Sequence, residues 1–106
     1  MAITKEQLLD LGFKPAKRAS SLSKRKYDSL IFSLNKTDYI FLGYNIYTKN
    51  IDFKRLWKTF LNRETNETLT YSIDRLGELS YTTVKEFLEQ EVERSKLIQE
   101  YYDKQS

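Results

Sequence analysis

The first residues of the chain follow the pattern of a short amphipathic helix with both ends marked. Thr4 precedes the segment KEQLLDL, and Gln7 stands three residues after it, which is the spacing of a capping box. The leucines of this segment give it one apolar side, and Gly12 supplies a stop signal. The pattern therefore predicts a short helix that ends at Gly12, with Phe13 as an apolar anchor after it.

A polar segment, KPAKRASSLSKRKYD, follows from Lys14 to Asp28. It contains Pro15 and several serines, and Leu22 is its one aliphatic anchor. Proline and serine in such a run are typical of turns and loops, so we expect an irregular, exposed segment. It carries six basic residues before its first acid: Lys14, Lys17, Arg18, Lys24, Arg25 and Lys26.

Alternation of apolar and polar residues begins at Tyr27 and continues to Tyr47, in YDSLIFSLNKTDYIFLGYNIY. Aromatic and β-branched residues flank the turn-like sequence at residues 35–38, which predicts a β-hairpin. The segment TLTYSI, residues 68–73, has the same alternation and predicts a further strand. Gly43 inside the second arm of the hairpin suggests a β-bulge or a close approach of backbone.

The segment IDFKRLWKTFLN, residues 51–62, fits two patterns. Its apolar residues satisfy helical spacing, yet they also suit a strand that enters the polar turn RETNE. We favour the strand, because the predicted strand at residues 68–73 needs a neighbour. The helical alternative would leave a sheet of three strands.

A helical period appears after Gly77. Thr83 and Glu86 form a second capping box, and the apolar residues that follow recur every three to four positions over about 20 residues. The whole chain, residues 1–106, is therefore expected to form a single α+β domain: a short N-terminal helix, a small antiparallel sheet of three or four strands, and a long C-terminal helix on one face.

Composition removes several classes of chemistry. The 106 residues include no Cys and no His, which excludes thiolate nucleophiles, disulfides, imidazole bases and zinc sites of the Cys/His type. The N-terminus lacks the pattern of a signal peptide, and no segment approaches the roughly 20 apolar residues that cross a bilayer. We expect a soluble cytoplasmic protein with no membrane contact.

Carboxylate pairs are the remaining candidates for catalysis or metal binding, at Glu64 with Glu67 and at Glu89 with Glu93. Both pairs lie in polar surface patterns, which a solvated turn and a charged helix face explain without chemistry. The three glycines are too far apart to form a phosphate-binding loop. We therefore expect a protein that is not an enzyme and needs no cofactor or metal.

Binding is the function class that the residues favour. The formal charge is only +3, but the basic segment, with Lys49, Lys54, Arg55 and Lys58, would suit a phosphate-tracking stripe beside tyrosines. The same charges, set against an acidic C-terminal helix, would equally orient a protein partner. The candidate partner-binding residues are Lys17, Arg18, Lys24, Arg25, Lys26, Tyr44 and Trp57. Trp57 is as well suited to a core position as to a contact.

The order of elements adds a resemblance. A helix ending in LLDLGF, the aromatic hairpin, the strand TLTYSI and the closing TTVKEFLEQE together resemble small accessory proteins of phages and mobile elements in the Bacteroidetes. With its basic segment and C-terminal extension, the chain looks similar to anti-CRISPR proteins that act on type VI RNA-guided nucleases. The resemblance implies stoichiometric binding to a bacterial nuclease effector, or to its guide-RNA channel. The alternatives are direct RNA or DNA binding through Lys14 to Lys26, and a structural role in a phage particle.

Overall fold

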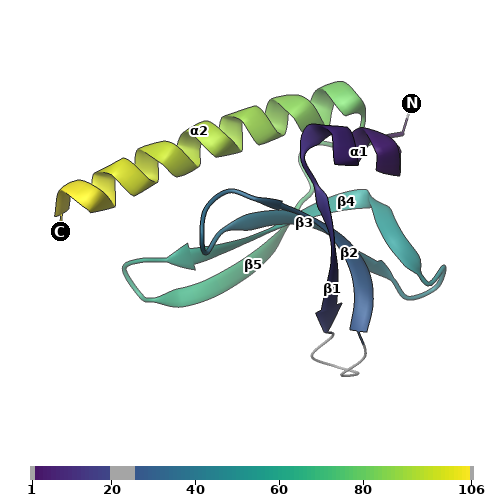
Figure 1. The fold of residues 1–106 in the computed structure, drawn as a ribbon, viewed down its shortest axis with the longest axis horizontal. Helices are drawn as coiled ribbons and strands as arrows, with labels where there is room; N and C mark the ends of the chain where they lie inside the picture. The colour runs from purple at the N-terminus through teal and green to yellow at the C-terminus, as the bar shows by residue number, and fades with distance from the viewer. Residues whose placement is uncertain (1, 20–25, 106) are drawn as a thin grey trace.

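The chain folds into a short helix, a five-stranded antiparallel sheet and a long helix (Figure 1). The computed structural model describes residues 2–19 and 26–105. The elements are α1 (Lys5–Leu11), β1 (Lys14–Ala19), β2 (Lys26–Ser33), β3 (Tyr39–Asn45), β4 (Asn50–Asn62), β5 (Glu67–Ile73) and α2 (Tyr81–Gln105). The α+β class is confirmed, but the sheet has five strands where the sequence predicted three or four.

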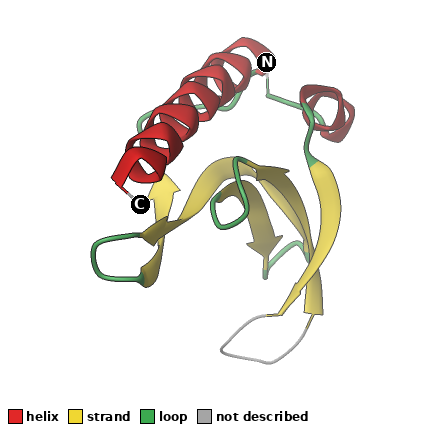
Figure 2. Ribbon diagram, turned by 60° about the vertical axis from the view of Figure 1, so that its left-hand side comes forward, coloured by secondary structure: helices red, strands yellow, loops and turns green. Residues whose placement is uncertain are grey.

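The sheet is a meander in which each strand pairs with the next one in sequence. β1 and β5 form its two edges, and both helices lie on the same side of it (Figure 1, Figure 2). On that side, a row of apolar residues runs across four strands: Leu30, Leu42, Leu56 and Ile73. We call this side the inner face and the opposite side the outer face.

The core fills the space between the inner face and the helices. The apolar row packs with buried side chains from the helices and their connections, namely Ile3, Leu8, Phe13, Leu79, Val84, Phe87 and Leu88. Fully burying one such side chain contributes roughly 1.5–3 kcal/mol, so the core is what holds α2 on the sheet. The long C-terminal helix lies on one face, as predicted.

The start and stop of α1 are also confirmed. The Thr4 hydroxyl accepts a hydrogen bond from the Gln7 backbone N–H at 3.2 Å, and the Gln7 side chain accepts one from the Thr4 N–H at 3.1 Å. Gly12 adopts the left-handed conformation, with φ of 111°, and its N–H caps the end of the helix. The Thr4 hydroxyl and the Gly12 N–H thus provide hydrogen-bond partners for backbone groups that the ends of a helix otherwise leave unpaired.

The predicted start of α2 is wrong. The helix begins at Tyr81 rather than after Thr83, because the Ser80 hydroxyl accepts a hydrogen bond from the Thr83 backbone N–H at 3.3 Å. Ser80 is therefore the earlier capping residue, and nothing between it and Thr83 breaks a helix. The helix is 25 residues long, somewhat longer than the pattern predicted.

β1 lies in the segment that was expected to be irregular. Its six residues pair antiparallel with β2, from Lys14 opposite Ile31 to Ala19 opposite Lys26. Pro15 has no backbone N–H to donate, which a strand at the edge of a sheet tolerates. The prediction failed because proline and lysine are features of an edge strand as well as of a loop.

The other strand predictions hold. Residues 51–62 belong to β4, so the strand reading was correct and the helical alternative was wrong. A register shift between Leu42 and Tyr44 confirms the bulge predicted at Gly43. The Ser29 hydroxyl donates to the Leu42 carbonyl at 2.5 Å, which satisfies a buried acceptor beside this irregularity.

Candidate functional site

Both helices lie over the inner face of the sheet (Figure 2), so neither covers the outer face, and the outer face carries an aromatic cluster. Two cross-strand rows build it: Ile31, Phe41 and Trp57 in one, and Ser33, Tyr39 and Thr59 in the next. We define the outer-face cluster as the four residues Ile31, Tyr39, Phe41 and Trp57.

The rings of this cluster support one another. Phe41 and Trp57 stack at 6.3 Å between centroids and 19° between planes, and Tyr39 lies 5.7 Å from Phe41. Phe41 is only 7% exposed although no helix covers it, so its neighbours on the sheet bury it. The Trp57 indole nitrogen lies 3.9 Å from the position that a Cβ on Gly43 would occupy. Trp57 is therefore a partly exposed residue of the outer face, outside the core beneath α2.

Positive charge accompanies the cluster. The Arg55 guanidinium lies 5.9 Å from the Trp57 ring centroid, and it pairs with Asp74 at 3.2 Å. By register, Lys14 stands opposite Ile31, and Arg18 stands opposite Tyr27. Among the described residues of the strands, the positions in register with the cluster on the outer face hold no Asp or Glu. Asp74 directly follows β5 and offsets the charge of Arg55, so the positive charge that remains on this face lies at its β1 edge, and that edge suits an anionic partner.

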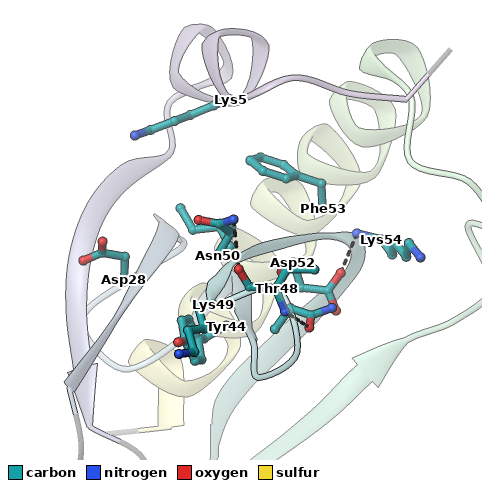
Figure 3. A pocket seen from close by; sticks show the side chains of 11 residues that line it. Lys5, Asp28, Tyr44, Thr48, Lys49, Asn50, Asp52, Phe53 and Lys54 are labelled. Atoms are coloured by element: carbon teal, nitrogen blue, oxygen red, sulfur yellow. Dashed lines mark hydrogen bonds between the residues drawn. The ribbon is translucent and has the colours of Figure 1, made fainter.

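The meander also brings two basic stretches of sequence to one end of the sheet. In an antiparallel meander, the last residues of β1, the first residues of β2 and the β3–β4 turn all lie at the same end of the sheet. This end, which we call the basic end, contains an open cleft of about 550 Å³ between α1 and the β3–β4 hairpin (Figure 3). Lys5, Tyr44, Lys49, Phe53 and Lys54 are among the residues that line it.

The carboxylates of the cleft already have partners. Asp28 forms an ion pair with Lys17 at 2.5 Å, and Asp52 accepts a hydrogen bond from the Lys54 backbone N–H at 2.9 Å. Within the described residues, the ammonium groups of Lys5 and Lys49 form no ion pair. The cleft thus presents cations beside aromatic surface.

The predicted partner-binding residues are distributed over these two regions. Lys17 is exposed at the edge of the basic end, Tyr44 lines its cleft with its ring 5.4 Å from that of Tyr27, and Trp57 belongs to the outer-face cluster. Lys24 and Arg25 lie outside the described residues. For Arg18 and Lys26 the structure describes the backbone: Arg18 pairs with Tyr27, and Lys26 pairs with Ala19 at the end of the β1–β2 ladder.

Lys58 is a correction to the predicted basic stripe. It lies on the inner face and its Nζ pairs with Glu91 Oε2 of α2 at 2.7 Å, in a contact where both side chains are buried. Arg94 lies 3.7 Å from the other Glu91 oxygen. Glu91 is one of the acids of the C-terminal helix that the sequence set against the basic segment, yet its spacing from Phe87 and Leu88 places it on the buried stripe of that helix.

The other carboxylates that the sequence singled out do not come together in a site. Glu64, Glu67, Glu89 and Glu93 are all exposed. Among the described residues, no group of three or more acidic side chains is placed to hold a metal ion. No helix in the described part of the chain is long and apolar enough to cross a membrane.

The chain was also compared with known proteins. It matches no family model, and no curated protein and no solved structure is significantly similar to it.

Proposed function

We propose that this protein is a non-enzymatic binding protein that contacts its partner through the outer-face cluster and the basic end. The observation that carries the proposal is a sheet face with a partly exposed tryptophan, cations beside it, and no carboxylate at its described strand positions. Aromatic and arginine side chains contribute most of the energy in many interfaces, whereas rim lysines guide association. Trp57 is the anchor, Arg55 lies beside its ring, and Lys14 stands at the β1 edge of the same cross-strand row.

The target that we propose is a type VI RNA-guided nuclease, which the protein inhibits by stoichiometric binding. The resemblance of the sequence to anti-CRISPR proteins supplies the target class, and the charge of the outer face supports it. An effector loaded with guide RNA presents phosphates, which are attracted to a cationic surface. Occupation of the guide-RNA channel would stop target cleavage without turnover of a substrate.

Direct binding of single-stranded RNA is the second candidate, because the outer-face cluster offers partly exposed rings beside cations. Stacking of a base on an aromatic side chain contributes about 1–3 kcal/mol and tolerates any base. Phe41 holds Trp57 in place from the neighbouring strand, so the indole is oriented before a base arrives. Under this candidate the protein binds RNA in the absence of any nuclease.

Charge reversal on two surfaces tests both candidates. The first variant carries Lys14→Glu and Arg18→Glu in β1, and a matched control carries Lys96→Glu and Lys104→Glu in α2, with the same change in net charge. Each protein is tested for inhibition of target-RNA cleavage by a purified effector with its guide, and for a mobility shift of labelled single-stranded RNA at low and physiological salt.

The inhibitor proposal expects the parent and the α2 control to inhibit at an equimolar ratio, and the β1 variant to require at least tenfold more protein. A salt-dependent shift of bare RNA that the β1 variant loses would support the second candidate instead. Absence of both inhibition and RNA binding in the parent would refute both. Equal losses in the β1 variant and the α2 control would show that only net charge matters.

A further inference from the structure

The two edges of the sheet differ in how they are protected. β1, with the sequence KPAKRA, carries proline and three cations, which discourage another strand from pairing with it. β5, with the sequence ETLTYSI, carries one charge, Glu67, and no proline or lysine. No other described strand pairs with the outer side of β5. The β5 edge is therefore an open template for strand addition.

Exposed apolar side chains gather beside this edge. Five large hydrophobic residues with exposures between 40% and 58% lie on β5 and on the second half of α2: Leu69, Tyr71, Leu97, Ile98 and Tyr101. Leu97, Ile98 and Tyr101 follow Arg94 at helical spacing, so they share its side of α2. Arg94 itself lines a cleft with Tyr71 of β5. The helical stripe and the strand consequently face the same space. We call these five residues the β5-side patch.

We propose that the β5-side patch is the interface of a two-fold symmetric homodimer, in which β5 pairs antiparallel with β5 of a second copy. A two-fold axis through Thr70 pairs the whole strand. It places Leu69 opposite Tyr71 of the other copy, Thr68 opposite Ser72, and Thr70 opposite itself. Glu67 then stands opposite Ile73, so no like charges face each other across the seam.

Charge complementarity favours a second copy as the occupant. α2 runs antiparallel to β5, because Arg94 lies near Tyr71 whereas Gln99, at 2.8 Å from Arg63, lies near the β4–β5 turn. The two-fold axis therefore brings the C-terminal part of one α2, with Glu100, to the level of Arg75 of the other copy. Arg75 forms no ion pair within the described residues. Glu100 of one copy and Arg75 of the other are therefore expected to lie at the same level, once at each end of the paired β5 strands.

The apolar residues also suit this arrangement. Adjacent strands lie about 4.8 Å apart, so two copies of Leu69 and Tyr71 form a continuous floor on the inner faces. The exposed stripes of the two helices, with Leu97 and Tyr101, stand on either side of that floor. An isologous interface needs a patch that complements itself in this way.

Single cysteines test the register, since the chain contains none of its own. Opposite residues in an antiparallel pair have Cα atoms about 4.5–5.5 Å apart, which suits a disulfide. Thr70→Cys should form a covalent dimer within minutes under mild oxidation. Thr68→Cys and Ser72→Cys should each cross-link slowly alone and at least tenfold faster when mixed. Tyr47→Cys, at an 88% exposed site in the β3–β4 turn, is the control for random collision.

Sedimentation equilibrium of the unmodified protein and of Leu97→Lys completes the test. The proposal expects a dimer in the parent at tens of micromolar and at least a tenfold higher dissociation constant in Leu97→Lys, whereas Tyr47→Lys behaves as the parent. A monomeric parent at this concentration would overturn it. Cross-linking of Thr70→Cys no faster than that of Tyr47→Cys would also overturn it. If the β5 edge of a monomer instead bound a strand of a different protein, that protein and not a second copy would be the partner of this edge, and the homodimer proposal would be wrong.

Discussion

Replacing Glu91 with alanine should loosen the contact between α2 and β4, because it removes half of a buried ion pair. Lys58 Nζ lies 2.7 Å from the Glu91 carboxylate, and the two side chains are 11% and 2% exposed. Removal of one partner from such a pair costs about 3–5 kcal/mol, since the other charge stays buried without compensation. The free energy of unfolding of a domain is typically about 5–15 kcal/mol, so Glu91→Ala should remove a large share of the stability of the protein.

The reciprocal change should cost less. In Lys58→Met, Glu91 keeps Arg94 at 3.7 Å as a second cation, and the methionine side chain fills the volume of the lysine stem. The expected loss is about 1–3 kcal/mol, the cost of one unmade hydrogen bond to a charged group. The double variant Lys58→Met with Glu91→Met removes both charges, and it should lie within about 1 kcal/mol of the parent.

Urea unfolding measures these differences. Trp57 is the only tryptophan, so its fluorescence reports the sheet, and far-ultraviolet circular dichroism reports α2. The reasoning is refuted if Glu91→Ala costs less than about 1 kcal/mol, which is the range of solvent-exposed pairs. It is also refuted if the double variant loses the sum of the losses of Lys58→Met and Glu91→Met measured singly, because the pair would then carry no coupling.

Three further substitutions test local features of the fold, each by urea or thermal unfolding. Gly12→Ala should destabilise by about 1–2 kcal/mol, because φ of 111° is strained for alanine and its Cβ would lie 3.0 Å from the Phe32 ring; an unchanged midpoint would show that the turn relaxes. Thr4→Ala should cost about 1 kcal/mol through loss of the cap, while Thr4→Ser should cost nearly nothing. Ser29→Ala should cost about 1–3 kcal/mol, because the buried Leu42 carbonyl loses its donor, and a smaller effect would point to a water in its place.

Local signals predicted most of the elements correctly. The capping box of Thr4 with Gln7, the stop at Gly12 and the alternation on either side of residues 35–38 each act through neighbouring residues, so the sequence contains them in full. The strand at residues 51–62 followed from the need of β5 for a neighbour. The capping and turn predictions succeeded because short-range backbone geometry decides them, whereas the strand at residues 51–62 had to be inferred from strand pairing.

Long-range contacts account for what the sequence did not reveal. β1 has the polar composition of a loop and becomes a strand only because β2 supplies its hydrogen bonds. Glu91 is buried because Lys58, 33 residues earlier, is its partner. Of the candidate site, the aromatic and basic residues were named, but the separation of Trp57 on the outer face from Lys58 on the inner face depends on their alternation in β4.

The meander has a consequence for how the chain reaches its native state. Because each strand pairs with its neighbour in sequence, the sheet consists of local hairpins that close short loops, and such contacts form quickly. α2 follows all five strands, so the part of the inner face that it covers stays exposed until that helix has been synthesised and has docked, although α1 is present from the start. A backbone hydrogen bond, donated by the Ile3 N–H to the Leu79 carbonyl at 2.7 Å, joins the N-terminal segment to the connection between β5 and α2. The risk of aggregation during synthesis is therefore highest after β5 has been completed and before α2 has docked.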